Sequence, residues 1–192
     1  MTLRGLYAIT PEPLDLAKLD RALQGRPALL QYRQKKRDVA QAREVIALAR
    51  RYDVPVVVND DVELALEIDA AGAHLGRDDG ELGMARKRLG GRILGASCYN
   101  DPDLARLAVR AGADYVAFGS VFPSPTKPGA VRAPLSLFST QLNVPVAAIG
   151  GITLQNANSV IEAGADLLAV ITDLFEAPDI ARRAAQYREL FA

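Results

Sequence analysis

The sequence predicts an α/β fold in which eight parallel strands alternate with helices and close into a barrel. Three observations support this prediction. Apolar runs of strand length alternate along the 192 residues with segments whose apolar residues recur at helical spacing. Most of the strand-like runs are apolar on both faces, as expected for parallel strands covered by helices. The joint Ala-Gly-Ala also recurs at residues 71–73, 111–113 and 163–165, each time between a helix-like segment and an apolar run.

The strands are expected, in chain order, at residues 3–9, 28–33, 55–59, 73–76, 93–97, 114–119, 145–149 and 166–171. Pro55 and Pro145 stand at the starts of the third and seventh strands, where a missing backbone N–H is tolerated. At each Ala-Gly-Ala joint we expect the glycine to end the preceding helix in the left-handed conformation, because glycine adopts it without steric cost.

Helices are expected between the strands, among them residues 38–52, 61–70, 101–111 and 153–163. Each begins with Asp or Thr, whose side-chain oxygen can accept a hydrogen bond from a first-turn N–H group. Residues 134–141 leave room only for a short sixth helix. The simplest closure is a compact single-domain (β/α)8 TIM barrel over residues 1–192, with short loops because such barrels usually exceed about 200 residues. An open doubly wound sheet is the alternative.

Composition excludes several classes of function. Twenty-three basic residues balance twenty-three acidic ones, so no overall field attracts nucleic acid or an anionic membrane. The single Cys98 excludes an internal disulfide and is expected to be a small buried or loop residue. No apolar run resembles a signal peptide or approaches the roughly 18 residues of a membrane span. We therefore expect a cytoplasmic protein that binds small molecules.

Two segments carry side chains suited to an anionic ligand. After the sixth strand, prolines restrict a loop that presents the hydroxyls of Ser124 and Thr126 and the amine of Lys127. An ordinary proline-rich turn is the alternative. At the second strand, Gln31, Arg33 and Lys35 are spaced by two, so in an extended chain they point to one face. An amide, a guanidinium fork and an amine together suit a diphosphate. Alternatively, Lys35 only starts a solvated loop.

Acidic residues follow the next two strands. Asp61 is expected to cap a helix, which leaves Asp60 unexplained. The fourth unit ends in Arg77-Asp78-Asp79 and brings another carboxylate to the neighbouring strand end. Magnesium is usually held by one or two carboxylates together with phosphate oxygens and water, so the pair predicts a Mg²⁺ site.

The last two strands predict a phosphate site. Gly150 and Gly151 end the seventh strand ahead of a helix, where backbone N–H groups can approach a phosphate. Thr172 follows the eighth strand beside them. In barrels of this type the loops after strands seven and eight commonly bind phosphate, although a Gly-Gly pair alone is usually just a turn.

The chain resembles the thiamine phosphate synthase family from residue 6 to residue 172, over nearly its whole length. The motifs that carry the resemblance follow in order: Gln31-Tyr32-Arg33-Gln34-Lys35, Asn59-Asp60, residues 74–79, Gly95-Ala96-Ser97, residues 118–127 and residues 148–152. The family joins hydroxymethylpyrimidine diphosphate to thiazole phosphate, which gives thiamine monophosphate and diphosphate.

The resemblance implies a role for each matching residue. Gln31, Arg33, Lys35 and Asn59 would hold the pyrimidine diphosphate, and Asp60 and Asp79 would bind Mg²⁺. Ser97 and Lys127 would contact the substrates around the leaving group. Arg33, Lys35, Ser97 and Lys127 are thus the expected catalytic residues. The thiazole phosphate would be bound by the set Ser124, Thr126, Gly151, Ile171 and Thr172.

The chain departs from the family pattern at three positions. Ser124 stands where Thr is commoner and Thr172 where Ser is commoner, and both keep a hydroxyl group. Arg77 replaces a usual Gln and adds a charge near the proposed metal site. A related thiazole tautomerase would need an acid–base residue, and the only histidine, His74, is expected to pack as a structural residue. A non-catalytic phosphate-binding barrel is the other alternative. The sequence is also compatible with a homo-oligomer.

Overall fold

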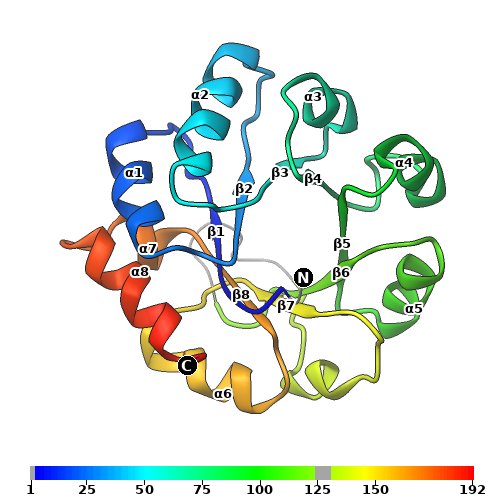
Figure 1. Cartoon of the computed structure of the whole chain (residues 1–192). Coiled ribbons are helices and arrows are strands. Elements are labelled where there is room, and N and C mark those ends of the chain that lie inside the picture. Colours follow the sequence, from blue (N-terminus) through cyan, green and yellow to red (C-terminus); the bar gives the residue numbers. More distant parts are fainter. Residues whose placement is uncertain (1–2, 124–130) are drawn as a thin grey trace.

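The structure is a computed structural model that describes residues 3–123 and 131–192. Eight parallel strands form a closed barrel in the order β1 to β8, and β8 pairs with β1. Helices form an outer ring around the strands (Figure 1). The predicted barrel is therefore confirmed, and the open sheet is not formed. The strands are β1 (Gly5–Ile9), β2 (Leu29–Tyr32), β3 (Val56–Asn59), β4 (Gly72–Leu75), β5 (Ile93–Tyr99), β6 (Tyr115–Gly119), β7 (Val146–Ile149) and β8 (Leu167–Val170).

The helices begin where the capping residues predict. The Asp38 carboxylate accepts a hydrogen bond from the Gln41 N–H group at 2.9 Å, and Asp61 accepts one from Leu64 at 2.7 Å. The predicted short sixth helix is the 3₁₀ helix η1 (Leu135–Ser139). The α-helices are α1 (Leu16–Gln24), α2 (Val39–Arg50), α3 (Val62–Glu67), α4 (Leu82–Leu89), α5 (Pro102–Arg110), α6 (Leu154–Glu162), α7 (Thr172–Phe175) and α8 (Ile180–Glu189).

The glycines of the Ala-Gly-Ala joints do not all act alike. Gly112 and Gly164 have the predicted left-handed φ values of 96° and 112°. The prediction is wrong for Gly72, which lies inside β4. After α3 the left-handed residue is Asp69, with φ 56°, because Asp tolerates this conformation through local hydrogen bonding. Gly72 is needed for space, since a Cβ atom there would lie 1.8 Å from the carbonyl oxygen of Ile93.

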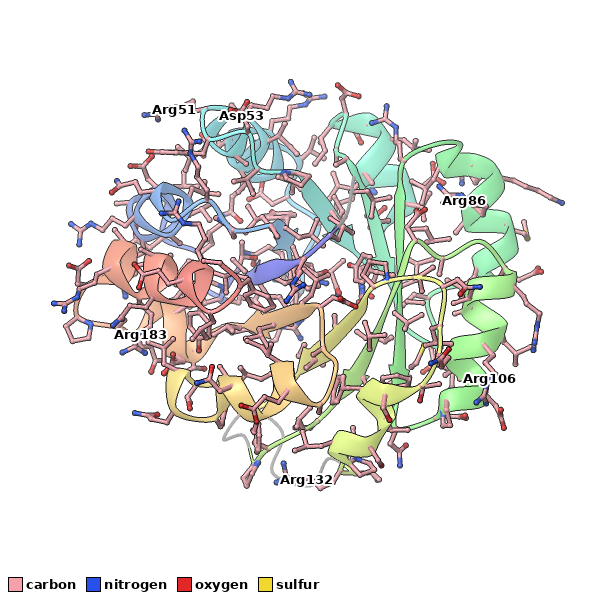
Figure 2. All side chains as sticks on the ribbon, turned by 60° about the horizontal axis from the view of Figure 1, so that its bottom comes forward. Arg51, Asp53, Arg86, Arg106, Arg132 and Arg183 are labelled. Carbon is pink, nitrogen blue, oxygen red and sulfur yellow. The ribbon has the colours of Figure 1, made fainter. Side chains whose placement is uncertain are left out.

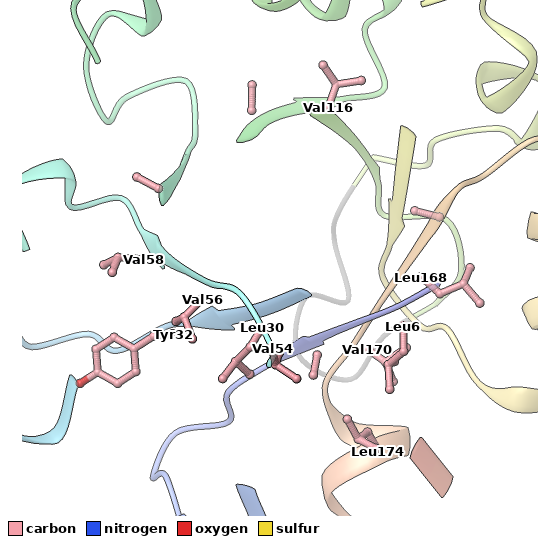
Figure 3. Close-up of a cluster of buried hydrophobic side chains, with 14 of the residues drawn as sticks. Leu6, Leu30, Tyr32, Val54, Val56, Val58, Val116, Leu168, Val170 and Leu174 are labelled. Carbon is pink, nitrogen blue, oxygen red and sulfur yellow. The ribbon is translucent and has the colours of Figure 1, made fainter. Parts of the chain in front are cut away.

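Apolar side chains form two separate layers. The outer layer packs between the strands and the helices, and Figure 3 shows part of it, with Leu30 of β2 near Val56 of β3 and Val170 of β8 toward Leu174 of α7. The inner layer fills the barrel interior. Its buried members are Leu3, Tyr7, Ile9, Leu29, Val57, Tyr115, Ala117, Ala147, Leu167 and Ala169. The interior is thus a packed core with no open channel, as expected for this fold.

Charged side chains lie at the periphery, as Arg51, Arg86 and Arg106 in Figure 2 illustrate. The polar side chains of Thr10, Gln31 and His74 are nevertheless buried in or directly after the strands. Across residues 3–123 and 131–192, no helix is both long and apolar enough to cross a membrane. The unusual polar groups of this molecule are therefore those inside the barrel and at the strand ends.

Candidate active site

The end of β2 brings an amide and a guanidinium group toward the barrel interior. Gln31 is 3% exposed, and its Nε2 atom donates to the Tyr7 hydroxyl at 2.6 Å. Two residues on, the backbone of Arg33 is fixed to β1 through Thr10. The Arg33 N–H group donates to Thr10 Oγ1 at 2.8 Å, and the Thr10 hydroxyl donates to the Arg33 carbonyl at 3.1 Å. The Arg33 side chain therefore extends from a backbone that is held in place at the carboxyl end of the barrel.

Lys35 lies beyond the strand and is less constrained. Its side chain is 80% exposed, and its Nζ atom lies 4.0 Å from Glu12 Oε2. Such a surface ion pair contributes little free energy, so the amine can leave Glu12 for a phosphate group at small cost. Of the three residues predicted on one face, Gln31 and the backbone of Arg33 are held by hydrogen bonds. Lys35 is held only by a surface ion pair.

A pair of carboxylates occupies the ends of β3 and β4. Asp60 has a left-handed φ of 62° and is held by its N–H group, which donates to the His74 carbonyl at 2.8 Å. Asn59 Nδ2 donates to the Asp60 carboxylate at 2.5 Å. Asp79 accepts from the Gly76 N–H group at 2.7 Å, which turns its carboxylate back toward the end of β4. The two predicted acids are therefore brought together by neighbouring strands.

The electrostatics of the pair are those of a cation site. Partial burial raises the pKa of the Asp60 carboxyl to about 6, and the hydrogen bond and negative charge of Asp79 add to this effect. Asn59 and Arg33 oppose it. Two carboxylates that repel one another gain stability from a divalent cation between them. Within residues 3–123 and 131–192, no cluster of three or more His, Cys, Asp or Glu side chains is formed. A bound Mg²⁺ would accordingly take its remaining ligands from water or substrate.

Tyr99 is a site residue that the sequence analysis did not include. It follows a register shift at the end of β5 and has a left-handed φ of 55°. Its hydroxyl accepts from the Arg77 N–H group at 3.3 Å, and the Arg77 guanidinium carbon lies 5.0 Å from its ring centroid. A Cβ atom on Gly76 would lie 2.6 Å from Asp79 Oδ2 and 3.4 Å from the Tyr99 hydroxyl. Tyr99 and Arg77 thus form one wall beside the acidic pair.

Ser97 points into the barrel and is tied to the single histidine. Its Oγ atom lies 2.8 Å from His74 Nε2, and His74 Nδ1 lies 2.8 Å from the Tyr115 hydroxyl. His74 is 5% exposed, and burial lowers its pKa to about 4, so the imidazole is neutral near pH 7. His74 is therefore packed inside the barrel, in agreement with the structural role predicted for it. Both of its ring nitrogens are hydrogen-bonded.

The glycine pair after β7 lies against the segment that leaves β6. Gly150 and Gly151 have φ values of 101° and 64°. A Cβ atom on Gly151 would lie 2.4 Å from the Pro123 carbonyl oxygen. The Phe122 N–H group also donates to the Gly150 carbonyl at 3.0 Å. The glycines therefore permit close approach of two backbones, which positions the chain up to residue 123. The predicted residues Ser124, Thr126 and Lys127 lie outside the described residues.

The end of β8 lies next to this glycine pair in the barrel. Ile171 packs against the inner apolar layer, and Thr172 is the first residue of α7. Asn156 links the neighbouring loop by donating from Nδ2 to the Gly151 carbonyl at 2.9 Å. Residues that the sequence analysis assigned to the site thus lie at or just beyond the carboxyl ends of β2, β3, β4, β5, β7 and β8, which is where barrels of this fold carry their active sites.

A closed parallel barrel with these groups at its carboxyl end defines a (β/α)8-barrel enzyme that acts on an anionic substrate. Residues 6–174 match the family described as Thiamine monophosphate synthase. The Thiamine-phosphate synthase of Aromatoleum aromaticum is 60% identical and that of Azoarcus sp. 54% identical, over 98% and 99% of this chain and 97% and 98% of theirs. The Thiamine phosphate pyrophosphorylase structure from Pyrococcus furiosus superposes with a TM-score of 0.87 at 31% identity, covering 98% of this chain and 96% of that one.

The chain belongs to the thiamine monophosphate synthase family. It is accordingly a transferase of thiamine biosynthesis. The resemblance inferred from the motifs is confirmed, because the matched region contains the strand ends that carry the basic, acidic and glycine residues.

Proposed function

We propose that the site joins 4-amino-2-methyl-5-hydroxymethylpyrimidine diphosphate to thiazole phosphate, with release of diphosphate and formation of thiamine monophosphate. The observation that carries this proposal is that the adjacent strands β2, β3 and β4 place Arg33 beside Asp60 and Asp79, where its charge lowers the pKa of Asp60. A positive fork beside two carboxylates suits a ligand that combines a diphosphate with a divalent cation, since each charge then faces its opposite.

The leaving diphosphate is bound by residues from the first half of the barrel. Arg33 can donate to two phosphate oxygens at once, and the fixed backbone at Thr10 limits the directions its side chain can take. Lys35 turns from Glu12 to the same group, while Gln31 and Asn59 bind the pyrimidine end. Charge that develops on the diphosphate as its bond breaks is stabilised by these positive groups, which lowers the barrier.

Asp60 and Asp79 are the residues that would hold Mg²⁺. Their fit rests on their positions after two adjacent strands and on the raised pKa of Asp60, to which the charge of Asp79 contributes. When bound, the ion supplies positive charge that neutralises the departing diphosphate. Asn59 orients Asp60 through its 2.5 Å hydrogen bond, which keeps the carboxylate in place for the ion.

The reaction needs no nucleophile from the protein. Loss of diphosphate leaves a pyrimidine methylene cation that the thiazole nitrogen captures, so the chief task is to hold two reactants in line. Cys98 is buried, and burial raises the pKa of its thiol to about 12, which keeps it protonated. This inert thiol agrees with a dissociative substitution in which no covalent enzyme intermediate forms.

The thiazole phosphate is bound on the other side of the barrel. We assign its phosphate to the hydroxyls of Ser124 and Thr126 together with Gly151, Ile171 and Thr172, and we assign Lys127 to the leaving group. Support comes from the glycine pair, whose missing side chains let residues 120–123 lie directly on the end of β7. The described chain up to residue 123 therefore lies beside the strands that carry Gly151, Ile171 and Thr172.

We also propose that residues 1–192 form one catalytic domain that works in the cytoplasm on dissolved substrates. Pairing of β1 with β8 supports the first part, because it completes the sheet. The thiazole tautomerase alternative is disfavoured by His74. This histidine is buried in the interior, and Tyr115 and Ser97 occupy its two nitrogens, so it is poorly placed to exchange protons with a substrate.

The test is diphosphate release by the purified chain with the pyrimidine diphosphate, with and without thiazole phosphate, in Mg²⁺ and then in EDTA. We expect release that requires both substrates and the metal, together with a thiamine monophosphate product. Absence of turnover under every condition would contradict the proposal and favour a phosphate-binding barrel without activity.

A further inference from the structure

Five buried or partly buried side chains form a continuous hydrogen-bonded chain across the barrel interior. It runs from β2 through β1, β6 and β4 to β5. Successive distances are 2.6 Å, 2.6 Å, 2.8 Å and 2.8 Å. The members, in order, are Gln31, Tyr7, Tyr115, His74 and Ser97. Gln31, at one end, is assigned above to the pyrimidine diphosphate, and Ser97, at the other end, is expected to contact the substrates around the leaving group. The three middle residues have no role in the proposed function.

Tyr7 and Tyr115, in the middle of this hydrogen-bonded chain, are closely packed. The rings of Tyr7 and Tyr115 meet edge to face, with centroids 5.6 Å apart and an interplanar angle of 88°. Gly95 leaves the space that Tyr115 fills, because a Cβ atom there would lie 2.2 Å from the tyrosine ring. Burial raises the pKa of both tyrosines above the ordinary value, so each hydroxyl keeps its proton. Each hydroxyl can therefore donate only one hydrogen bond.

Only one direction of the hydrogen bonds gives the buried Tyr7 proton a partner within this chain. Gln31 donates to Tyr7 from its amide nitrogen, so the Tyr7 proton is left for Tyr115. Tyr115 then accepts from Tyr7 and must donate its own proton to Nδ1 of His74. A neutral imidazole that accepts at Nδ1 carries its proton on Nε2 and donates it to Ser97 Oγ. Ser97 accepts this bond, and its own hydroxyl proton has no place in the chain.

We propose that Tyr7, Tyr115 and His74 are positioning residues that hold His74 as the Nε2–H tautomer and so direct the Ser97 hydroxyl proton toward an acceptor atom of the bound pyrimidine diphosphate. The identity of that ligand rests on the proposed function, whereas the direction of the chain does not. Burial, which lowers the pKa of His74 to about 4, agrees with the single N–H group that the argument requires. In the opposite direction Ser97 would give its proton to His74 and would present only lone pairs to the ligand.

Nitrogen NMR of the histidine side chain tests the direction without substrate or turnover. The protein contains one histidine, so untagged protein labelled with ¹⁵N-histidine gives a single pair of ring signals. We expect a protonated Nε2 and an unprotonated Nδ1 between pH 6 and pH 8. The reverse assignment would overturn the proposal. Because this readout needs no ligand, it is independent of whether the diphosphate-release test succeeds.

Two tyrosine variants test the coupling, because each removes a different link. In Tyr115→Phe, Nδ1 loses the donor that keeps it unprotonated, so we expect part of the population to shift to the Nδ1–H tautomer and kcat to fall by about tenfold, as for one lost hydrogen bond. In Tyr7→Phe, Tyr115 can still donate to His74, so we expect the Nε2–H tautomer to persist while KM for the pyrimidine diphosphate rises through Gln31. An unchanged tautomer in Tyr115→Phe would overturn the proposal.

The matched control is Tyr187→Phe. Tyr187 is also fully buried, but it lies on α8 and its hydroxyl donates to Asp173 at 2.7 Å, outside the barrel interior. Loss of this hydroxyl should leave the His74 tautomer and turnover unchanged. A similar loss of turnover in Tyr115→Phe and Tyr187→Phe, with the same tautomer in both, would show that the hydroxyls serve stability alone and would overturn the proposal.

Discussion

Asp60 and Asp79 follow neighbouring parallel strands and lie close enough that the charge of Asp79 helps to raise the pKa of the Asp60 carboxyl. Asp60 lies directly after β3 in a left-handed conformation. Asp79 lies in the turn after β4, where the Gly76 N–H group binds its carboxylate. In the protein without metal, protonation of Asp60 near pH 6 relieves the repulsion between the two carboxylates. Two predictions follow from this pair, one for metal binding and one for stability.

Mg²⁺ binding should weaken as the pH falls through about 6, the pKa of Asp60. The ion needs both carboxylates ionised, so below this pH it must displace a proton. We expect the affinity for Mg²⁺ in the presence of inorganic diphosphate to fall by up to about tenfold per pH unit below 6. Calorimetry in two buffers of different ionisation heat should detect proton release at pH 5.5 and little at pH 8. Equal affinity at both pH values would contradict the prediction.

Asp60→Asn should stabilise the metal-free protein at pH 7.5. The pKa of Asp60 is higher in the folded than in the unfolded chain, so its ionisation costs stability as the pH rises from about 4 to about 6. Asn cannot ionise, and it tolerates the left-handed φ of 62°. We expect a higher Tm at pH 7.5, a smaller difference at pH 4.5, and a loss of turnover of roughly 100-fold or more. A lower Tm at pH 7.5 would show that repulsion is not the dominant effect.

The barrel itself could be predicted because its signals are local. The apolar runs between helix-like segments located the strands to within a few residues. The capping side chains of Asp38 and Asp61 located two helix starts. Parallel order then follows from the alternation, since a strand, a helix and a strand can close in few ways. The predicted positions of Asp60 and Gln31 at strand ends needed only this order.

The interior chain could not be predicted, because its contacts join distant positions. Tyr7 and Tyr115 are 108 residues apart, and no local pattern distinguishes them from other apolar strand residues. Tyr99 was missed because a register shift extends β5 beyond the expected end of the strand. At Gly72 the prediction was wrong because one sequence motif meets two different physical needs. Its glycine provides a left-handed backbone at two joints and space for a neighbouring strand at the third.

Gly95→Ala should destabilise the barrel by overpacking its interior. The added Cβ atom would lie 2.2 Å from the ring of Tyr115, which is fully buried and cannot move outward. We expect a loss of about 1–3 kcal/mol in the free energy of unfolding. The control is Gly91→Ala, where a Cβ atom meets nothing within 4 Å. Denaturant unfolding of both variants measures the difference, and equal stabilities would mean that the interior is loosely packed around Tyr115.

Gly151→Ala should impair thiazole phosphate binding more than pyrimidine diphosphate binding. Two effects act at this position, the left-handed φ of 64° and a Cβ atom that would lie 2.4 Å from the Pro123 carbonyl oxygen. The collision would push the segment leaving β6 away from β7, where we place the thiazole phosphate, while the β2 and β3 ends stay unchanged. We expect KM for thiazole phosphate to rise by about tenfold or more, as for a lost hydrogen bond to a charged group.

Gly90→Ala separates these two effects. Gly90 has a similar φ of 58°, but a Cβ atom there meets nothing within 4 Å. With ψ −122° as well, Gly90 has a backbone conformation that disfavours an L residue, so this variant carries backbone strain of at least about 1 kcal/mol without the collision. Steady-state kinetics with each substrate varied in turn should show a selective change in Gly151→Ala and none in Gly90→Ala. If KM for both substrates rose equally in Gly151→Ala, the glycine pair would serve the barrel as a whole, and the thiazole phosphate would have to bind elsewhere.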